Sequence, residues 1–519
     1  MLLVADYSGK VLELPWWALL LLALVAYRAF NTLTYYVAYK KSGATLAPAV
    51  SDGWYGFKLM RVVVEKQKKG EMPDYLYSRF IETGKDTVRL VMAGTPVVST
   101  RDPENIKALL GTQFNDFILG LRHKQFQILL GDGIFTLDGA GWKHSRAMLR
   151  PQFAREQVGH VRSLEPHVQA LARLIRRTNG QEFDIQPLFF KLTIDSGTEF
   201  LFGESCESLS EDEPGFANSG PAVKREFPKA FNTSQSYLFL RAGFQKLYWI
   251  VNNSDFRKNN KIVHEFADYY VNKALNSTPE EVEKFSNQGY VFLYELSKQT
   301  RDPKVLRDQC LNILLAARDT TAGLLSFMFF ELARNPHVFA RLREEIIQAF
   351  GEGDDADLSA ITFESLKKLE YLKWVINETL RLYPSVPQNF RVATKDTTLP
   401  RGGGPNRDQP IFVRKGQTVT YTIYATHRSE EIYGKDVLTY RPERWGELAM
   451  KKVGWGFLPF NGGPRICLGQ QFALTEASYV TVRLLQMFKN IQSFDDCDTP
   501  KKATHLTMSL FDGAHIGLS

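Results

Sequence analysis

The apolar segment between Asp302 and Asn335 constrains the fold more than any other part of the chain. Asp302 can cap the start of a helix, Pro303 suits a first turn, and the pair Asn335-Pro336 ends it. A helix between these signals would be about 48 Å long, at 1.5 Å per residue. Because it is apolar on almost all sides from Leu311 to Phe330, we expect it to be buried in a large domain.

A polar interruption, Arg318 to Thr321 ("RDTT"), lies at the middle of this segment. In a transmembrane helix the two charges would lie at mid-bilayer and cost about 2.5–3.5 kcal/mol each, so a core helix is favoured. Two interpretations of the interruption stay open. It is a satisfied buried polar pair, or it is a site that needs a hydroxyl and a carboxylate within an apolar wall.

The N-terminal run Leu14 to Tyr27 is also nearly continuously apolar. The run is short for a membrane span, which needs about 20 residues. It extends to Phe30 if the charged end of the Arg28 side chain snorkels to the membrane surface. A cleaved signal peptide is disfavoured, because Asp6 and Glu13 precede the run and no strong small-residue cleavage site follows. A buried core helix is an alternative. We favour a membrane anchor.

Basic residues follow the run, and they indicate that the bulk of the protein lies in the cytosol. We expect residues 1–38 to form the anchor and its flanks, 39–50 a hinge, and 51–519 one catalytic domain. Helical periodicity dominates this domain, with strand-like runs at 88–100 and 410–424, so the predicted class is α+β with helices in the majority. The chain has 4 cysteines and no CxxC pair, which favours a reducing compartment.

Three smaller patterns are ordinary when taken alone. Glu378 and Arg381 are three residues apart on one helical face, which is usually a surface ion pair. Trp142 and Arg146 share a face at a spacing of four, and Arg444 lies in the compact turn "YRPERW".

The loop "FNGGPRICLG", Phe460 to Gly469, raises a sharper question. Cys467 lies just before a run with apolar helical spacing, so it is placed at a helix N-terminus, where free N–H groups favour an anion. Gly463 and Gly469 let the backbone turn without Cβ clashes, and Arg465 adds positive charge. These features favour a thiolate beside a flat group.

The residues of the loop are compatible with two roles for a Cys467 thiolate. A catalytic nucleophile would need a nearby histidine, and neither His427 nor His505 is placed beside Cys467 by the sequence. An axial metal ligand is the alternative, and a thiolate bound to haem iron favours cleavage of the O–O bond.

The loop resembles the FxxGxRxCxG signature of the cytochrome P450 haem-thiolate monooxygenases. The other motifs of that family follow in order, and the resemblance covers about residues 45–519. The positions that carry it are Trp142 and Arg146 (WxxxR), "AARDTT", Glu378 and Arg381 (ExxR), Arg444, and then Phe460, Gly463, Arg465, Cys467 and Gly469.

The resemblance implies a role for each of these residues. Cys467 would be the axial ligand of haem b, with Phe460 shielding its sulfur and Gly463 and Gly469 lying against the haem. Asp319 and Thr320 would be the acid–alcohol pair that delivers protons to dioxygen. The propionates would be held by Trp142, Arg146, Arg391 and Arg465, and the core would be held by the ion-pair triad Glu378, Arg381 and Arg444.

The chain departs from the family pattern at Ala317, where glycine is usual at a bend of the long helix. Ala316 stands where some animal fatty-acid hydroxylases carry a glutamate esterified to haem, so we expect non-covalent haem. No flavin or dinucleotide motif is found, so the resemblance implies that NADPH-derived electrons arrive through a separate cytochrome P450 reductase, with cytochrome b5 as an optional donor. It also implies a membrane-lipid partner, the endoplasmic reticulum as location, and no nucleic-acid partner.

Segments 131–146, 390–404 and 460–477 look like the fungal cytochromes P450 that hydroxylate n-alkanes and fatty acids at or near the terminal carbon. The segments 115–126, 227–240 and 385–390, expected at the substrate pocket, are apolar and aromatic, although any P450 pocket is apolar. Another hydrophobic substrate, such as a sterol, an aromatic acid or a secondary metabolite, stays open. A haem-thiolate sensor is disfavoured because a sensor needs no proton delivery by Asp319 and Thr320.

Overall fold

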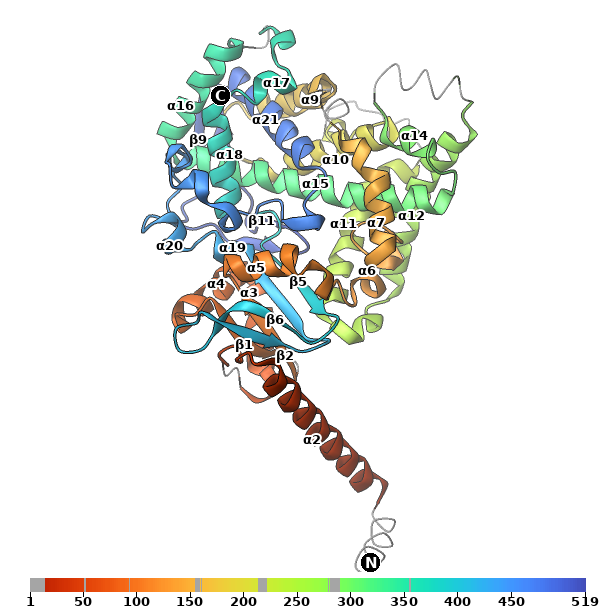
Figure 1. Ribbon diagram of the computed structural model, residues 1–519. Coiled ribbons are helices and arrows are strands. Elements are labelled where there is room, and N and C mark those ends of the chain that lie inside the picture. Colours follow the sequence, from red (N-terminus) through yellow and green to blue (C-terminus); the bar gives the residue numbers. More distant parts are fainter. Residues whose placement is uncertain are drawn as a thin grey trace, which may run out of the picture.

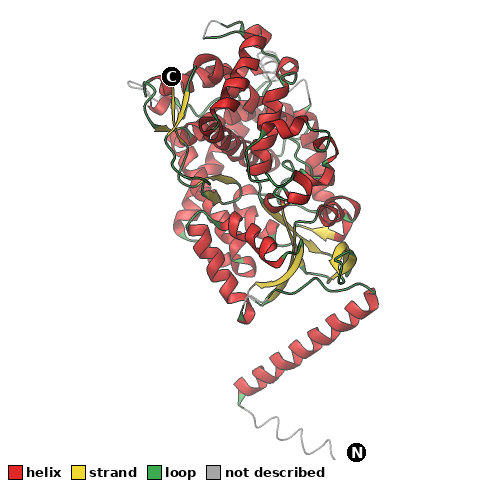
Figure 2. Cartoon of the chain, turned by 90° about the vertical axis from the view of Figure 1, so that its left-hand side faces the viewer, coloured by secondary structure: helices red, strands yellow, loops and turns green. Residues whose placement is uncertain are grey.

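The computed structural model describes residues 15–50, 53–92, 94–154, 159, 161–212, 222–278, 280, 290–353 and 356–519. Most of this chain is helical, and the largest sheet lies at the end of the body nearest the N-terminal helix (Figures 1 and 2). The predicted class is therefore confirmed. The longer helices are α2 (Trp16–Ser42), α3 (Phe57–Lys68), α4 (Met72–Thr83), α6 (Arg122–Leu130), α7 (Gly139–Leu149), α9 (Glu165–Arg176), α10 (Gln186–Phe202), α11 (Ala222–Gly243), α12 (Ser254–Asn276), α15 (Pro303–Arg334), α16 (Pro336–Phe350), α18 (Glu370–Leu382) and α21 (Gln470–Met487).

Shorter helices connect these elements, and the strands are short. The short helices are α5 (Pro103–Lys107), α14 (Phe292–Ser297), α17 (Phe363–Leu366), α19 (Ile423–Thr426) and α20 (Glu430–Tyr433). The strands are β1 (Thr87–Met92), β2 (Thr95–Thr100), β3 (Phe117–Ile118), β4 (Phe183–Asp184), β5 (Gln388–Ala393), β6 (Thr397–Gly403), β7 (Gln409–Val413), β8 (Thr418–Thr422), β9 (Ile491–Ser493), β10 (Lys502–Thr504), β11 (Met508–Leu510) and β12 (His515–Leu518).

The largest sheet has the order β1-β2-β8-β5-β3. Within it β2 and β8 are parallel, with Val97 opposite Thr418, and the other pairs are antiparallel. The strand-like runs predicted at 88–100 and 410–424 form β1, β2, β7 and β8, which confirms them. This sheet brings β5, and with it Arg391, beside the segment that carries β3.

Helix α15 crosses the body as one continuous helix with the predicted ends. The Asp302 carboxylate caps it by accepting from the N–H groups of Lys304 at 2.9 Å and Val305 at 3.3 Å. Its apolar stretch would be long enough to cross a membrane, but 78% of that stretch is buried. The core-helix prediction is therefore confirmed, and the helix shows no break at Ala317.

Helix α2 projects from the body (Figure 2), and none of its residues is buried. At 1.5 Å per residue its 27 residues extend about 40 Å. Its second half docks on the sheet, because Arg414 donates to the carbonyl of Asn31 at 3.0 Å and to the hydroxyl of Thr34 at 2.8 Å. The part before Asn31 remains exposed and apolar, as an anchor requires. Asp6, Glu13 and Leu14 lie outside the described residues.

The segment predicted as a hinge, 39–50, is not a free linker in the structure. The helix continues to Ser42 and ends at Gly43, which has a φ of +67°. Thr45 then pairs with Ile411 and Ala49 with Arg89 in isolated bridges, so the backbone is tied to two strands. Local sequence suggested flexibility, but backbone hydrogen bonds to distant strands hold the segment in place.

Candidate functional site

The cysteine loop turns sharply and then starts α21. The N–H of Cys467 donates to the carbonyl of Phe460 at 3.0 Å, and α21 begins at Gln470, as predicted. Gly463 has a φ of +67°, and a Cβ there would lie 1.9 Å from the carbonyl oxygen of Leu110, so only glycine fits. Gly469 is different, because its φ of −85° is open to any residue. The sequence interpretation that Gly469 is needed for the turn is therefore wrong.

The electrostatic environment of Cys467 is mixed. Burial in the protein raises the pKa of the Cys467 thiol, whereas the backbone N–H of Gly469 and the guanidinium of Arg146 lower that pKa. Arg146 also donates to the carbonyl of Ile466 at 2.9 Å, which brings its charge to the loop. The helix N-terminus alone therefore does not ionise the thiol. A bound metal cation would, because coordination deprotonates a thiol.

Four arginines lie close to this loop, and two of them, Arg146 and Arg465, lie over the ring of Trp142. The guanidinium of Arg465 lies 4.4 Å from the Trp142 ring and pairs with Asp138 at 2.8 Å. The pKa of Arg465 is lowered to about 10, mainly by burial and also by the charges of Arg391 and Arg146. Burial likewise lowers the pKa of Arg122 to about 9, with Arg391 as the next cause. The four guanidinium groups, those of Arg122, Arg146, Arg391 and Arg465, thus lie near one another.

This arginine cluster fits the two propionates of haem. Asp138 is the one carboxylate that pairs with a cluster member among the described residues, so most of the positive charge is uncompensated. Nε of Arg391 is buried and has no hydrogen-bond partner in the described part of the chain. Buried charge of this kind is costly unless an anion binds it, and guanidinium pairs well with carboxylates. Arg146 and Arg465 lie beside Trp142, and Arg391 and Arg146 are close enough to Arg465 to lower its pKa. The binding of propionates by these four residues stays a prediction.

The polar interruption in α15 contains a local network. The carboxylate of Asp319 pairs with Arg318 at 3.1 Å, and burial raises the pKa of Asp319 while Arg318 lowers it. The Thr320 hydroxyl donates to the carbonyl of Ala316 at 2.7 Å, and the Thr320 carbonyl accepts from Ser385 at 3.3 Å. Thr320 is half-buried although most of α15 is buried. Because its hydroxyl acts as a donor to Ala316, the oxygen keeps lone pairs that can accept a further hydrogen bond.

Two of the apolar segments expected at the substrate pocket, 115–126 and 227–240, contribute to the core. Phe126, Phe227 and Phe231 are buried inside one hydrophobic cluster. Leu315, in the middle of α15, and Leu468, next to Cys467, both pack against this cluster. The cluster therefore connects the acid–alcohol segment of α15 to the cysteine loop.

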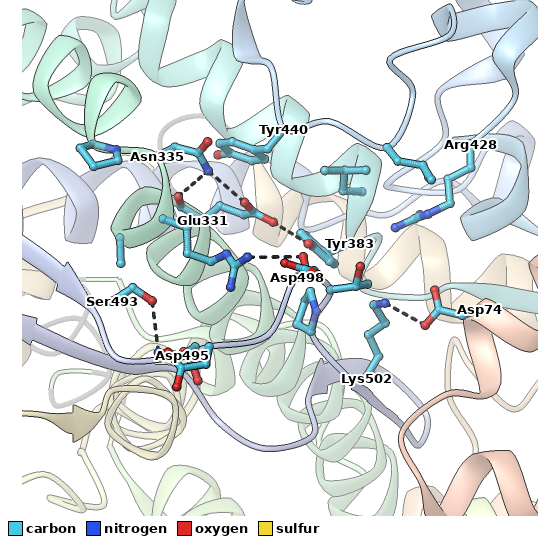
Figure 3. Close-up of a pocket in the computed structure, with 18 of the residues that line it drawn as sticks. Asp74, Glu331, Asn335, Tyr383, Arg428, Tyr440, Ser493, Asp495, Asp498 and Lys502 are labelled. Carbon is cyan, nitrogen blue, oxygen red and sulfur yellow. Dashed lines mark hydrogen bonds and ion pairs between the residues drawn. The ribbon is translucent and has the colours of Figure 1, made fainter.

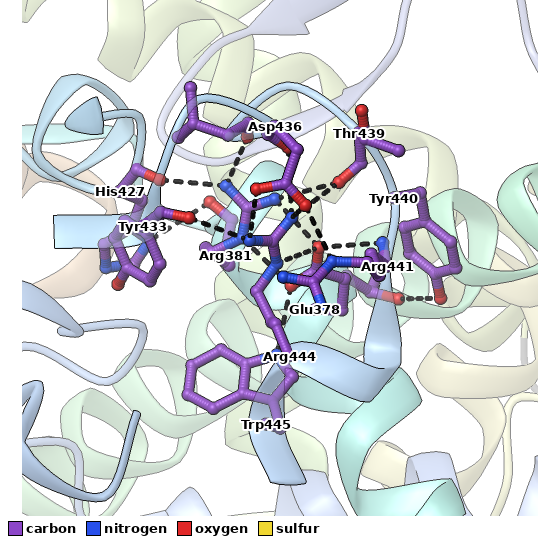
Figure 4. Close-up of polar contacts among 12 residues, drawn as sticks. Glu378, Arg381, His427, Tyr433, Asp436, Thr439, Tyr440, Arg441, Arg444 and Trp445 are labelled. Carbon is purple, nitrogen blue, oxygen red and sulfur yellow. Dashed lines mark hydrogen bonds and ion pairs between the residues drawn. The ribbon is translucent and has the colours of Figure 1, made fainter. Parts of the chain in front are cut away.

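Glu378, Arg381 and Arg444 form a fully buried ion-pair network (Figure 4). Both oxygens of Glu378 accept from Arg381, at 2.8 and 2.9 Å, and one accepts from Arg444 at 2.9 Å. Asp436 supplies a second carboxylate, 3.3 Å from Arg444. The two arginines also donate to backbone carbonyls of the segment 427–439, so the network holds the chain that leads to the cysteine loop.

His427 connects this network to the cysteine loop, and the sequence analysis missed that role. Its Nδ1–H donates to the carbonyl of Arg381 at 3.1 Å, and its Nε2 accepts from the N–H of Leu458 at 2.8 Å. One ring nitrogen donates and the other accepts, which is the pattern of a neutral imidazole. The pKa of His427 is lowered to about 3, mainly by burial and also by the charge of Arg381. His427 is thus a structural bridge between the ion-pair network and the cysteine loop. Arg122 is a second residue that the sequence did not point to. No local sequence motif marks either residue.

We expect the neutral state of His427 to make the fold acid-sensitive. Above pH 6.5 the ring is neutral in both the folded and the unfolded chain. As pH falls from 6.5 towards 3, the unfolded chain binds a proton that the folded chain does not, so about 1.4 kcal/mol is lost per pH unit. Denaturant unfolding across this range should show a steeper loss for the wild type than for His427→Gln. His337→Gln, at an exposed histidine, should match the wild type, and equal slopes for all three would contradict this expectation.

Comparison with known proteins agrees with this geometry. The family model described as Cytochrome P450 matches residues 54–510. The chain is 64% identical over 495 residues to cytochrome P450 52A12 of Debaryomyces hansenii, which covers 95% of each protein. It is 59% identical over 521 residues to cytochrome P450 52A5 of Candida maltosa, covering 99% of this chain and 98% of that one. The solved haem domain of cytochrome P450DA has a similar fold, with a TM-score of 0.71 at 22% identity over 92% of this chain and 97% of that one.

The chain belongs to the cytochrome P450 family. It is therefore a monooxygenase that carries haem with a cysteine thiolate ligand and receives electrons from a reductase, as predicted. The relatives from Debaryomyces and Candida also confirm the resemblance to a fungal group.

Proposed function

We propose that this chain hydroxylates long-chain aliphatic compounds, n-alkanes or fatty acids, at or near the terminal carbon. The observation that carries the proposal is the high identity to fungal relatives of one group, at 54–64% over nearly the whole chain. The residues on α15 that precede the polar stretch, Leu315, Ala316 and Ala317, are apolar and half-buried, which is compatible with an aliphatic substrate.

Turnover with NADPH and cytochrome P450 reductase tests this substrate class. A panel from decane to octadecane and the corresponding fatty acids should yield terminal or subterminal alcohols, and a labelled fatty acid should report which carbon is attacked. A haem-loaded enzyme that oxidises no member of the panel would contradict the proposal, and conversion of a sterol or an aromatic acid would favour another substrate class.

The residue roles follow from the chemistry of each group. Bound haem supplies the iron at which dioxygen is reduced and one oxygen atom is transferred to a C–H bond. Cys467 would ligate the iron, and Arg122, Arg391 and Arg465 would hold the propionates. Phe460 and Gly463 would shape the loop beneath the ring, and the missing side chain of Gly469 would leave room beside it.

Asp319 and Thr320 are proposed to move protons to the dioxygen site. The burial-raised pKa of Asp319 suits a carboxyl group that takes up and releases protons, and the Thr320 hydroxyl can pass a proton on. Cytochrome P450 reductase is the proposed electron donor, with cytochrome b5 as an optional second one.

Thr320→Ala should uncouple electron use from hydroxylation. Without the hydroxyl, proton delivery to dioxygen fails and reduced oxygen leaves as hydrogen peroxide, so peroxide per NADPH should rise about tenfold. Peroxide and product measured in the same reaction check this. Thr320→Ser should restore coupling, and Thr321→Ala, at the buried neighbour, should stay coupled. Unchanged coupling in Thr320→Ala would remove Thr320 from the proton route.

The proposed location is the endoplasmic reticulum membrane, with α2 as the anchor and the body in the cytosol. Deletion of residues 1–30 should make the protein extractable by alkaline carbonate, because this deletion removes the exposed apolar part of α2 and keeps its docked part. The catalytic domain should retain its haem and its stability. A truncated protein that resists extraction as well as the full chain would contradict α2 as the principal anchor.

A further inference from the structure

A hollow lies between the C-terminal end of α15, α19 and the C-terminal strands (Figure 3). Its volume is about 940 Å³. Glu331 of α15 contributes to its wall, together with Asp74, Arg428 and Lys502. None of the residues proposed to bind haem or move protons lines it, so it is a separate site.

Arg428 is the unusual group in this wall. Its side chain is 5% exposed, lies 3.5 Å from the centroid of the Tyr424 ring, and donates to the Tyr424 carbonyl at 3.3 Å. Figure 3 shows its guanidinium directed towards the hollow. The buried arginines Arg381, Arg444 and Arg483 each pair with a carboxylate. No carboxylate of the described residues pairs with Arg428. A buried guanidinium without a counter-ion is costly, so the geometry favours a bound anion.

The other inner groups do not neutralise Arg428. Lys502 is already paired with Asp74 at 2.8 Å. Glu331 accepts from the hydroxyl of Tyr383 at 2.5 Å and from the side-chain amide of Asn335 at 3.1 Å, and among the described residues no ion pair joins it to Arg428. The inner wall therefore keeps the positive charge of Arg428.

The outer wall carries more negative than positive charge. Asp495, Asp496 and Asp498 belong to the segment that borders the hollow, and Asp496 and Asp498 are exposed. Arg334 is the cation beside them, and its guanidinium donates to the backbone carbonyls of Cys497 and Asp498. Carboxylates at this position repel a plain anion and attract a cation. The two walls together therefore select a molecule that carries both charges.

We propose that this hollow binds a small zwitterion, whose carboxylate or phosphate pairs with Arg428 and whose ammonium group faces Asp496 and Asp498. Guanidinium accepts either anion in a planar, two-bond geometry, so both sources share one chemistry.

Two matched pairs of compounds test the proposal on the full-length holoenzyme by ligand-observed NMR. Glycine and acetate share a carboxylate, and phosphoethanolamine and ethyl phosphate share a phosphate. In each pair only the first compound has an ammonium group. We expect the zwitterion to bind more tightly than its partner, and the stronger pair identifies the preferred anion.

Three variants separate the contributions. Arg428→Gln should weaken binding of the zwitterions about tenfold or more, since a charge-assisted hydrogen bond is lost. Arg428→Lys keeps the positive charge but loses the planar guanidinium, so its affinity for the zwitterions should lie between those of the wild type and Arg428→Gln. Replacing Asp496 and Asp498 together by asparagine should abolish the preference for the zwitterion. Arg343→Gln, which removes a surface pair with Glu352 outside the hollow, is the control and should bind as the wild type does.

The binding measurements can contradict the proposal in three ways. Absence of binding of all four compounds to the wild type, or equal affinities of the wild type and Arg428→Gln, would overturn the proposal. If Arg428→Gln does not fold, the variant at exposed Asp496 and Asp498 decides instead, and an unchanged preference for the zwitterion in that variant would also overturn it.

Discussion

Replacement of Cys467 by alanine is expected to abolish monooxygenase turnover and the thiolate-type spectrum of the reduced carbonyl complex. Alanine offers no ligand, and without a thiolate the haem iron loses the electron donation that favours O–O cleavage. The fold itself should persist, because the hydrogen bond that shapes the loop, from the backbone N–H of Cys467 to the carbonyl of Phe460, does not involve the cysteine side chain. Carbonyl-difference spectra and turnover on the substrate panel, measured together, check both parts.

Cys497→Ala provides the matched control for that prediction. Cys497 is exposed and lies near Arg334 rather than in the loop before α21, so its loss should leave the spectrum and the turnover unchanged. A Cys467→Ala protein that kept the thiolate-type spectrum would disprove the ligand assignment. Loss of both signals in Cys497→Ala as well would point to general damage instead.

Replacement of Glu378 by glutamine is expected to destabilise the protein by about 3–5 kcal/mol. The change leaves the guanidinium groups of Arg381 and Arg444 buried with only Asp436 as a counter-charge. Glutamine is similar in size, so the cost comes from charge and hydrogen bonds rather than from a cavity. Because the network holds the chain towards the cysteine loop through His427, haem should also be lost more easily. Denaturant unfolding of the holoenzyme and the rate of haem transfer to an acceptor measure the two effects.

The control for this prediction is Glu447→Gln, at an exposed carboxylate that pairs with Arg441 at 2.5 Å. Exposed ion pairs contribute about 0–1 kcal/mol, so this variant should be close to the wild type. A loss below about 1 kcal/mol in Glu378→Gln would show that the network is not a stabilising element. In that case its role would be confined to positioning.

Features set by neighbouring residues were predictable from the sequence. The ends of α15 depend on Asp302, Pro303 and Asn335, which act within one turn, and the structure has those ends. The sharp turn at Gly463 and the start of α21 after Cys467 follow in the same way from local backbone preferences. The burial of α15 was predictable because its apolar surface has no polar face to turn towards water.

Other features were predicted wrongly because distant contacts override local signals. The segment 39–50 looked like a flexible hinge, yet strands far along the chain pair with Thr45 and Ala49. Gly469 looked like a turn glycine, yet its φ is ordinary. The segment 227–240 was expected at the substrate pocket, yet Phe227 and Phe231 at its start are fully buried in the hydrophobic core. In each case the residue type was compatible with two environments, and only the neighbours in space chose between them.

The sequence by itself determined the class of the protein, the long core helix and the cysteine loop, because these depend on hydrophobic period, capping residues and a short motif with fixed spacing. Only the tertiary structure decided which charges meet. Arg122, Arg391 and Arg465 come from three distant segments, and His427 connects the network around Glu378 to Leu458. The physical reason is that the energy of a buried charge depends on its partners in space, and the packing of whole helices and sheets sets those partners rather than the spacing of residues along the chain.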